Sequence, residues 1–448
     1  MQVVIIGAGN VGFTLARTLS KQHSVMMIEQ DEKRFEHIVE SLDVGALNAN
    51  GASPKVLRNA INGKTEMLLA VTERDEVNIF ACLVAKQLKP NLCTVARVRN
   101  PDYLEGGLDS DLLNVDYVLS PEHLTAAKMK MIATIENAVD YECIPALGVE
   151  MAKFRVTAKH LSVLSKPIEH LPVPENSRII VVHRRGEVIM PKGNDFLVVG
   201  DEVTVIGTGD GIERFNDMLG RVREPRDFII VGGGIVGEHL LGMLEGEGYS
   251  IKLVEKDEAR CRALSRQFNN TVIINDKGAD PSVLRNENVN MADVLICATD
   301  SEEENLLACL IGKHLGVPKT VTKYSRREYE NVFDMSGVDA AIGYYHVVAN
   351  EIVKRTVPEL NVLLLLEGFT EEFFGVVITD QCRQNGKMVD QIELPERSII
   401  AMVVKEGKAT IPTAETVLGE GDMVLIYASR PDISRLERMF RTHIPLNP

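Results

Sequence analysis

The sequence lacks an apolar stretch long enough to cross a membrane. A transmembrane helix needs about 20 consecutive apolar residues, and the nearest candidate, residues 360–366, reaches about a third of that length. The first residues already read as an apolar strand rather than as a secretory leader. We therefore expect no signal peptide, no direct membrane insertion and a cytoplasmic location.

An excess of positive charge is also missing. The chain has 49 Lys and Arg against 64 Asp and Glu, a net charge of −15. Nucleic-acid binding requires a basic face, and an anionic membrane surface attracts basic segments. The charge balance disfavours both, but it is compatible with docking onto the basic cytoplasmic loops of a membrane protein.

Common catalytic motifs are absent as well. The patterns Gly-x-x-x-x-Gly-Lys, Gly-x-Ser-x-Gly, His-Glu-x-x-His and Cys-x-x-Cys do not occur. The ten histidines are scattered, and none of His160, His170 and His183 recurs at its matched position later in the chain. Because a dehydrogenase needs a proton relay beside its cofactor, we expect a binding module with no catalytic residues.

The seven cysteines form an odd set without the spacing of a disulfide framework. This usage fits reduced thiols in a cytosolic protein. Cys82, Cys297 and Cys309 lie in apolar patterns, which predicts buried core residues. A redox-sensing role for one of them is the alternative.

The most informative feature that is present is a Gly-x-Gly-x-x-Gly turn that occurs twice. Each turn follows an apolar strand and precedes a second strand that ends in an acid. The residues are Gly7, Gly9, Gly12 and Glu29 in copy one, and Gly232, Gly234, Gly237 and Glu255 in copy two. Residues 51–58 also match 278–285, and 69–72 match 296–299. A repeat this long indicates two whole domains of one kind.

Each copy alternates short apolar runs with helical patterns. In copy one the predicted strands are residues 3–6, 25–29, 44–47, 67–71, 94–97 and 117–119, and helices begin near Gly12, Glu32, Pro54, Asp75 and Pro101. Such alternation predicts a parallel sheet covered on both faces. The expected fold class is α/β, with two doubly wound Rossmann-type domains.

A shorter stretch of different character follows each Rossmann-type domain. Residues 148–207 and 368–427 read as short strands with turns, closed by helices at 210–219 and 432–440. We expect a small α+β lobe in each case. The predicted domains are residues 1–122, 138–222, 226–345 and 358–443, with a charged linker at 221–226.

The glycines of such a turn have separate tasks. Gly7 allows the tight turn, Gly9 lets a pyrophosphate approach the backbone, and Gly12 lets the helix pack on the strand. The helix N-terminus attracts phosphate. Glu29 is placed to bind ribose hydroxyls and would repel a 2′-phosphate, which favours NAD(H) or an adenine nucleotide over NADP. The alternative is a purely structural turn, and copy two could be retained as scaffold.

Further candidates lie at the ends of later strands. Thr72 and Thr299 end the fourth strand of each copy and are either ligand contacts or helix caps. The acids that follow them, at 73, 75 and 76 and at 300 and 302–304, compensate helix dipoles without requiring a metal. Arg97 and Lys323 end the fifth strands, where they either reach a phosphate or lie on the surface.

The chain resembles a known family in several segments. These are Gly-Ala-Gly-Asn-Val-Gly at 7–12, Ala-Ser-Pro-Lys-Val-Leu at 52–57, Leu-Ala-Val-Thr at 69–72 and Ala-Arg-Val-Arg-Asn-Pro-Asp-Tyr at 96–103. They resemble the RCK (KTN) domains of potassium transport regulators. The double copy is similar to the peripheral NAD-binding subunits of Trk potassium uptake systems, and the likeness covers essentially the whole chain.

The resemblance implies a regulator on the cytoplasmic face of a TrkH-type potassium-transporting membrane protein. It implies a homotetrameric ring, with NAD, NADH, ATP or ADP as ligand. Site one would comprise Gly7, Ala8, Gly9, Asn10, Val11, Gly12, Glu29, Asn50, Gly51, Thr72, Glu73 and Arg97. Site two would comprise Gly232, Gly233, Gly234, Ile235, Val236, Gly237, Glu255, Thr299 and Asp300. The chain departs from the family at Ala49, where a further glycine is usual, and carries Lys277 in the matching loop.

A helix predicted at 121–137 carries Leu124, Ala127, Met131 and Ile135 at helical spacing. This face is either ordinary core or, as the resemblance implies, part of a crossover helix at a dimer interface, with 340–353 as its counterpart. The leading hypothesis is therefore allosteric gating of a potassium transporter. An NAD-dependent oxidoreductase and a redox-sensing transcriptional regulator are the alternatives.

Overall fold

The computed structural model describes residues 2–20, 23–100, 103, 114–220, 225–356 and 371–440. The first six strands form one parallel sheet in the order β3-β2-β1-β4-β5-β6. These strands are β1 (Gln2–Ile6), β2 (Ser24–Glu29), β3 (Gly45–Asn48), β4 (Thr65–Ala70), β5 (Cys93–Arg97) and β6 (Tyr117–Leu119). Its helices are α1 (Asn10–Leu19), α2 (Glu32–Ser41), α3 (Pro54–Ala60) and α4 (Asp75–Leu88). The helix expected near Pro101 lies outside the described residues.

The second half repeats this sheet in the order β14-β13-β12-β15-β16-β17. Its strands are β12 (Asp227–Val231), β13 (Ser250–Glu255), β14 (Thr271–Asn275), β15 (Val294–Cys297), β16 (Lys319–Tyr324) and β17 (Ala340–Gly343). Its helices are α10 (Ile235–Leu244), α11 (Glu258–Gln267), α12 (Pro281–Asn286), α13 (Glu302–Leu315) and α14 (Glu330–Ser336). Both sheets reverse their strand order between the first and fourth strands of the copy, so the prediction of two doubly wound domains is confirmed.

An antiparallel sheet forms the core of each small lobe. The first has the order β10-β9-β11-β8-β7 and the second β18-β21-β19-β20. The first lobe contains β7 (Ala138–Ile144), β8 (Val149–Arg155), β9 (Ser177–Arg184), β10 (Glu187–Ile189), β11 (Glu202–Gly207) and the helices α8 (Leu161–Leu164) and α9 (Gly209–Gly220). The second contains β18 (Glu371–Val377), β19 (Ser398–Lys405), β20 (Lys408–Thr410), β21 (Met423–Ser429) and α16 (Arg430–Phe440). The predicted α+β character is confirmed for both lobes.

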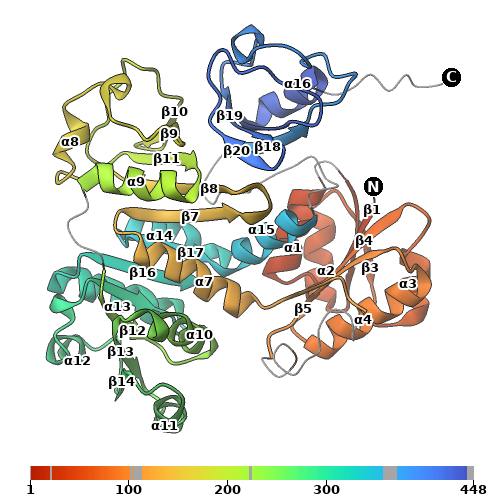
Figure 1. The fold of residues 1–448 in the computed structure, drawn as a ribbon. Helices are drawn as coiled ribbons and strands as arrows, with labels where there is room; N and C mark the ends of the chain where they lie inside the picture. The colour runs from red at the N-terminus through yellow and green to blue at the C-terminus, as the bar shows by residue number, and fades with distance from the viewer. Residues whose placement is uncertain are drawn as a thin grey trace.

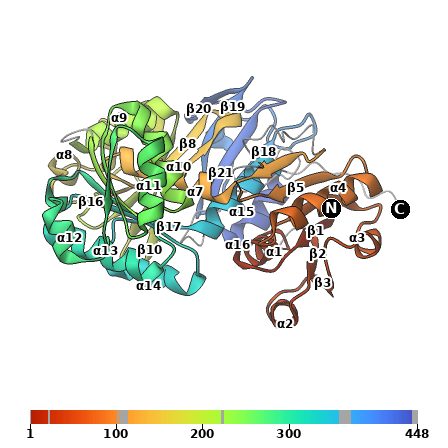
Figure 2. The same ribbon diagram turned by 90° about the horizontal axis from the view of Figure 1, so that it is seen from below.

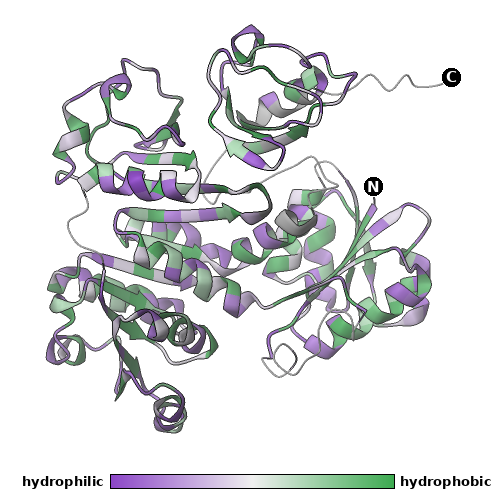
Figure 3. Cartoon of the chain, in the orientation of Figure 1, coloured by the Kyte–Doolittle hydropathy of each residue, from purple (hydrophilic) through white to green (hydrophobic). Residues whose placement is uncertain are grey.

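Apolar strands explain where the cores lie. Green, hydrophobic residues run along the strands in Figure 3, whereas purple, hydrophilic residues cover the outer helix faces. The two small lobes also share a core, in which Met151 and Ile180 of the first lobe pack with Met402 and Tyr427 of the second. The buried cysteines fit this pattern, since Cys82, Cys297 and Cys309 are fully inaccessible. Burial raises the pKa of the Cys82 and Cys297 thiols.

The helix after each Rossmann-type sheet crosses to the other half of the chain. α7 (Pro121–Thr134) packs against α10 and β16, and α15 (Tyr344–Thr356) packs against α1. Figures 1 and 2 show α7 extending from the first Rossmann-type domain to the second, and α15 lying beside α1. The two halves are thereby interlocked by an exchange of helices.

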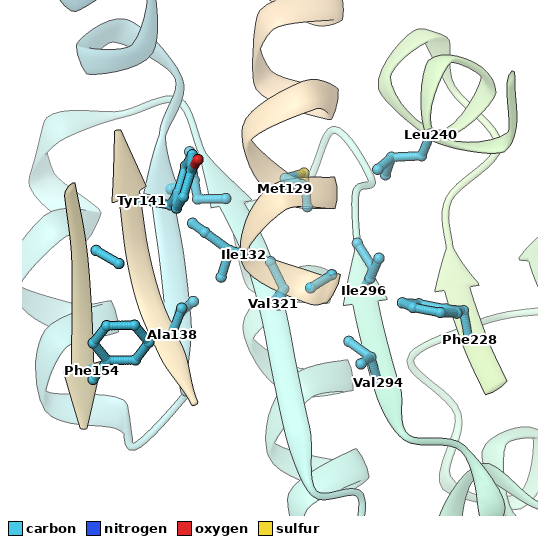
Figure 4. Close-up of a cluster of buried hydrophobic side chains, with 14 of the residues drawn as sticks. Met129, Ile132, Ala138, Tyr141, Phe154, Phe228, Leu240, Val294, Ile296 and Val321 are labelled. Atoms are coloured by element: carbon cyan, nitrogen blue, oxygen red, sulfur yellow. The ribbon is translucent and has the colours of Figure 1, made fainter. Parts of the chain in front are cut away.

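The buried face of α7 differs from the predicted one. Met131 is exposed, whereas Met129 and Ile132 are fully buried in a core that includes residues of the second Rossmann-type domain. Figure 4 shows Met129 on the side of Leu240 and Ile296, and Ile132 on the opposite side, toward Tyr141 and Ala138 of β7 and near Val321 of the second sheet. The helix is covered from several sides, by α10, β7, α15 and β16, so a single apolar stripe does not describe it.

The ends of the crossover helices also differ from the predicted ones. α7 ends at Thr134, where Lys319 of β16 donates hydrogen bonds to the carbonyls of Ile132 and Ile135. Its counterpart was predicted from residue 340, but residues 340–343 form the strand β17 and the helix starts at Tyr344. Four apolar or small residues before a helix cannot be distinguished from its first turn by periodicity. Among the described residues, no helix combines the length and the apolar character that a membrane span requires.

Candidate nucleotide-binding sites

Cavity one opens at the carboxyl ends of the first parallel sheet and has a volume of about 590 Å³. This is where an open α/β sheet places its ligands. The predicted residues that line it are Gly7, Gly9, Asn10, Val11, Glu29, Asn50, Gly51, Thr72, Glu73 and Arg97. Ala8 and Gly12 were also predicted but are not part of the lining. One cavity thus gathers residues from β1, β2 and β5 and from the turns that follow the first four strands.

The glycine turns have the same geometry in both copies. Gly7 and Gly232 have φ angles of +98° and +105°, a conformation that side chains disfavour. A Cβ atom on Gly12 would lie 1.9 Å from the carbonyl oxygen of Gly7, and one on Gly237 would lie 2.0 Å from that of Gly232. Because Gly12 and Gly237 have no Cβ atom, each helix can lie this close to the preceding strand.

The middle glycine of each turn faces open space instead. A Cβ atom on Gly9 would meet only Arg34 Nη1 at 3.8 Å, and one on Gly234 would meet nothing within 4 Å. Both residues are helix N-caps without a side-chain hydrogen bond. The first N–H groups of α1 and α10 therefore receive no cap from a side chain, as an anion site requires.

The acids that end β2 and β13 are tied to the glycine turns. Glu29 is buried, and its carboxylate accepts hydrogen bonds from the N–H groups of Ala8 at 2.6 Å and Asp31 at 2.9 Å. Glu255 accepts from Gly233 at 2.6 Å and Asp257 at 2.8 Å. Each carboxylate thus places a negative charge where the second strand meets the cavity.

Thr72 and Thr299 hold the turn after the fourth strand of each copy. The Thr72 hydroxyl donates to Asn78 Oδ1 at 2.7 Å, and Asn78 Nδ2 donates to the Arg97 carbonyl at 2.8 Å. Thr299 and Asn305 repeat the first of these bonds at 2.8 Å. Neither threonine is a helix N-cap. The geometry therefore supports a local turn contact beside the cavity over the predicted capping alternative.

The acids at the starts of α4 and α13 pin the loop that follows the next strand. Asp75 accepts hydrogen bonds from the N–H groups of Arg99 at 2.9 Å and Asn100 at 2.8 Å. Glu302 accepts from the Ser325 N–H at 3.1 Å and pairs with Arg326 at 3.0 Å. Burial alone would raise the pKa of Glu302, but these hydrogen bonds and its own backbone N–H lower it. The described residues contain no group of three or more His, Cys, Asp or Glu arranged to hold a metal ion.

The second half of the chain supplies part of the wall of cavity one. Its contributions are Ile235, Val236, Asp300, Lys323, Ser325 and Tyr344. Asn10 Nδ2 donates to the Ser325 carbonyl at 2.7 Å, which joins the first glycine turn to the other half. Ile235 and Val236 were predicted for site two, and Lys323 was predicted as the counterpart of Arg97 in copy two. All three line cavity one instead, because the interlocked halves bring the two glycine turns together.

A polar cluster at this junction connects the halves. Arg97 Nη2 donates to the Tyr344 hydroxyl at 2.9 Å, and that hydroxyl donates to Glu122 Oε1 at 2.8 Å. Arg99 Nε also contacts Glu122, at 2.9 Å. Burial raises the pKa of Tyr344, so its hydroxyl stays protonated as a donor. The Arg97 side chain is buried, and its Nε atom has no hydrogen-bond partner among the described residues.

Cavity two lies at the same edge of the second sheet and has a volume of about 850 Å³. Of the predicted residues it is lined by Gly232, Gly234, Glu255, Thr299 and Asp300, but not by Gly233 or Gly237. It is also lined by Lys256, Arg260 and Lys277. The cations of cavity two thus come from its own half, whereas those of cavity one include a lysine of the other half.

Several lining residues were not identified from the sequence. Arg34 and Arg260 occupy matched positions and line their cavities, each three residues after the N-cap aspartate of its helix. An arginine at the same position of both copies is a signal in the sequence that points to a shared role. Arg99, Glu122 and Tyr344 gave no such local signal, since their proximity depends on the crossing of α7 and α15.

Two parallel sheets, each with an open glycine turn and a cavity at its switch point, define a protein with tandem Rossmann-type domains and accessory small lobes. The TrkA-N domain model matches residues 3–121 and 228–343, and the TrkA-C domain model matches 151–220 and 373–441. These matches cover most of the sequence. The chain belongs to the TrkA family.

Individual relatives agree with this assignment. The Trk system potassium uptake protein TrkA homolog of Archaeoglobus fulgidus is 32% identical over 98% of this chain and 100% of its own length. TrkA homolog 1 of Methanosarcina mazei is 31% identical over the same shares. Among solved structures, the GsuK RCK domain aligns with a TM-score of 0.61 at 18% identity, covering 98% of this chain and 94% of that one. The GsuK channel bound to NAD aligns with a TM-score of 0.60 at 17% identity, covering 98% and 78%. The expected RCK fold is therefore confirmed.

Proposed function

We propose that this chain is a nucleotide-binding regulatory subunit that gates a TrkH-type potassium-transporting membrane protein in response to NAD(H) or ATP/ADP. The observation that carries the proposal is the pair of cavities at open glycine turns. Family membership supports a role in potassium uptake, which the names of the relatives state for those proteins. The similar GsuK channel was solved with NAD bound, which makes NAD(H) the first ligand to test.

The charges around the glycine turn favour NAD(H) over NADP(H). Glu29 ends the strand where a Rossmann-type site places the ribose, and its carboxylate is held there by backbone N–H groups. A 2′-phosphate would face this fixed negative charge. Gly9 leaves room for a pyrophosphate over the N-terminus of α1.

Cavity one offers a route from nucleotide binding to a change of shape. Its wall includes residues of both halves, so a ligand bound there contacts both at once. A nucleotide shifts the equilibrium between two arrangements only by its differential affinity for them. A coupling of about 1–3 kcal/mol is typical of allosteric proteins, and different nucleotides would supply different amounts.

Exposed apolar residues on two outer helices support assembly into a ring. Phe80 on α4 and Leu307 on α13 occupy matched positions of the repeat, and each is 50% exposed. An exposed apolar side chain therefore occurs at the same place on both Rossmann-type domains, and we refer to the surface around it as the matched face. Copies of the chain that join through these faces could alternate around a closed ring, as in the proposed homotetramer. The net charge of −15 suits docking of this ring onto basic cytoplasmic loops of the transporter.

Potassium flux through the reconstituted partner tests the proposal. Gly9→Trp fills the mouth of cavity one without a backbone clash, because a Cβ atom there has open space. Gly63→Trp is a matched control, since Gly63 is exposed with no atom within 4 Å of its Cβ position and does not line cavity one. We expect nucleotide-dependent flux with the wild type and Gly63→Trp, and a reduced response with Gly9→Trp. An undiminished response from folded Gly9→Trp protein would exclude cavity one as the regulatory site.

A direct assay separates this proposal from an oxidoreductase. Purified protein mixed with NADH and a range of carbonyl acceptors should show no sustained loss of NADH absorbance. Steady turnover that is lost in Gly9→Trp would instead favour a dehydrogenase.

A further inference from the structure

The carboxylate of Asp300 stands between the two cavities. Within the described part of the chain, Asp300 is the residue common to both linings. It follows Thr299 at the carboxyl end of the second half's fourth strand, so its backbone belongs to cavity two. Its partner Lys323 lies at the end of β16 and lines cavity one.

The two residues of this ion pair differ in burial. Lys323 Nζ lies 3.5 Å from Asp300 Oδ1, and the lysine side chain is buried whereas that of the aspartate is fully exposed. A buried ammonium requires a nearby negative charge. A solvated carboxylate, in contrast, loses little when it turns away. The phosphate of a ligand in cavity one could therefore replace Asp300 as the partner of Lys323.

We propose that Asp300 couples the two cavities with a negative sign. This proposal rests on the proposed function, because it requires anionic nucleotides in both cavities. A phosphate on Lys323 releases the Asp300 carboxylate from cavity one. The charge then acts on cavity two, where it repels the phosphates of a second ligand. By linkage, a ligand in cavity two weakens binding in cavity one by the same factor.

The repeat provides a control for this role. Glu73 is the residue of copy one that matches Asp300, and it lines only cavity one. It pairs with Arg34 of its own half at 3.1 Å. Removal of the Glu73 charge changes the potential of one cavity, whereas removal of the Asp300 charge changes the link between the two.

Calorimetric titration with ADP at low ionic strength tests the proposal. Gly9→Trp isolates cavity two and Gly234→Trp isolates cavity one, since both glycines face open space. These variants give the affinity of each cavity alone. In the wild type we expect the second ADP to bind about fivefold or more weakly than these affinities predict, within the range of known couplings. This loss of affinity for the second ADP, the binding deficit, should shrink at higher salt, where charges are screened.

Substitutions at Asp300 assign the coupling to its charge. Asp300→Asn should remove the deficit, whereas Asp300→Glu and Glu73→Gln should retain it. Thermal unfolding should be unchanged in Asp300→Glu, which keeps a negative charge beside the buried Lys323, and should occur at a lower temperature in Asp300→Asn, which removes that charge. Independent binding in the wild type, or an equal deficit in Asp300→Asn, would overturn the coupling while leaving the proposed function intact. Absence of ADP binding from the wild type and both single-cavity variants would overturn the proposed function as well.

Discussion

At the scale of single residues, hydrogen in place of a side chain at Gly12 sets the distance between α1 and the first sheet. The Gly7 carbonyl oxygen occupies the space that a Cβ atom would need. Gly9, two residues after Gly7, has no such constraint and faces the cavity. Chemically identical residues in one motif thus act on different properties, packing in one case and ligand access in the other.

This difference predicts the outcome of two alanine substitutions. Gly12→Ala should lower the melting temperature by several degrees, because overpacking costs about 1–3 kcal/mol and each kcal/mol shifts the melting temperature of a large domain by about 2–4 °C. Gly9→Ala should change it by about 1 °C or less. Thermal unfolding followed by circular dichroism measures both. Equal melting temperatures for the two variants would contradict the assigned packing role of Gly12.

The burial of His183 on β9 predicts that the stability of the first small lobe depends on pH. Burial lowers the pKa of this imidazole to about 4, helped by the nearby charge of Lys153 and opposed by Glu202. As the pH falls below about 6.5, the unfolded chain takes up a proton that the folded chain does not. The folded state therefore loses up to about 3 kcal/mol between pH 6.5 and 4.

The second lobe suggests the matching substitution. Its strand β19 carries Val404 at the position of His183 in β9, so His183→Val is expected to fold. The melting temperature of the variant should fall less than that of the wild type between pH 7 and 5. Parallel curves for the two proteins would show that His183 does not titrate in this way.

The positions of residues that depend on sequence neighbours could be predicted, whereas those that depend on the interlocking of the halves could not. The glycines, Glu29 and Glu255 were identified because each role depends on neighbours along the chain. Lys323 and Ile235 line cavity one although the repeat places them in copy two, since their positions depend on how the halves interlock. Whether the predicted residues bind a nucleotide remains a prediction.

At the scale of elements, α7 contributes most to that interlocking. Its residue Met129 is buried against the second Rossmann-type domain, and Ile132 is buried between Val321 of that domain and strand β7 of the first small lobe. Burial of each such side chain contributes about 1.5–3 kcal/mol. The helix therefore links the first half of the chain to the stability of the second.

Two substitutions on α7 separate the true core face from the predicted one. Ile132→Ala should destabilise the protein by about 2–5 kcal/mol, as other large-to-small core changes do. Met131→Ala, one residue earlier but exposed, should cost about 0.5 kcal/mol or less. Chemical denaturation of both variants provides the comparison. A larger loss for Met131→Ala would restore the face predicted from helical spacing.

The strands were easier to predict than this helix. Each first-copy strand lies within about two residues of its predicted place, because most of these strands are buried on both faces and form continuous apolar runs. A helix buried on several sides has no single apolar stripe. Helical spacing therefore predicts the face of Leu124, Ala127, Met131 and Ile135, although Met129 and Ile132 are more buried. The partners of α7 come from distant parts of the sequence, and its own pattern does not encode them.

At the scale of the whole molecule, one chain contains two interlocked Rossmann-type domains and two packed small lobes (Figure 1). This pseudo-symmetric unit leaves the matched faces of α4 and α13 uncovered. The proposed ring requires these faces to meet in neighbouring copies. Its assembly should then depend on their apolar character.

Charge placed on the matched faces should dissociate the assembly. The double variant Phe80→Lys and Leu307→Lys should sediment as a smaller species than the wild type, because a buried unpaired charge opposes association. Both side chains are half exposed, so the fold of the single chain should survive. Analytical ultracentrifugation gives the masses. An unchanged mass would show that the ring, if formed, closes through another surface.

The central claim is that the open glycine turns bind nucleotides, and calorimetric titration of the purified protein with NADH tests it most directly. The account predicts saturable heat that loses one component in Gly9→Trp and the other in Gly234→Trp, whose substituted glycines both face open space. Absence of saturable heat with NADH, NAD, ATP and ADP alike would contradict it.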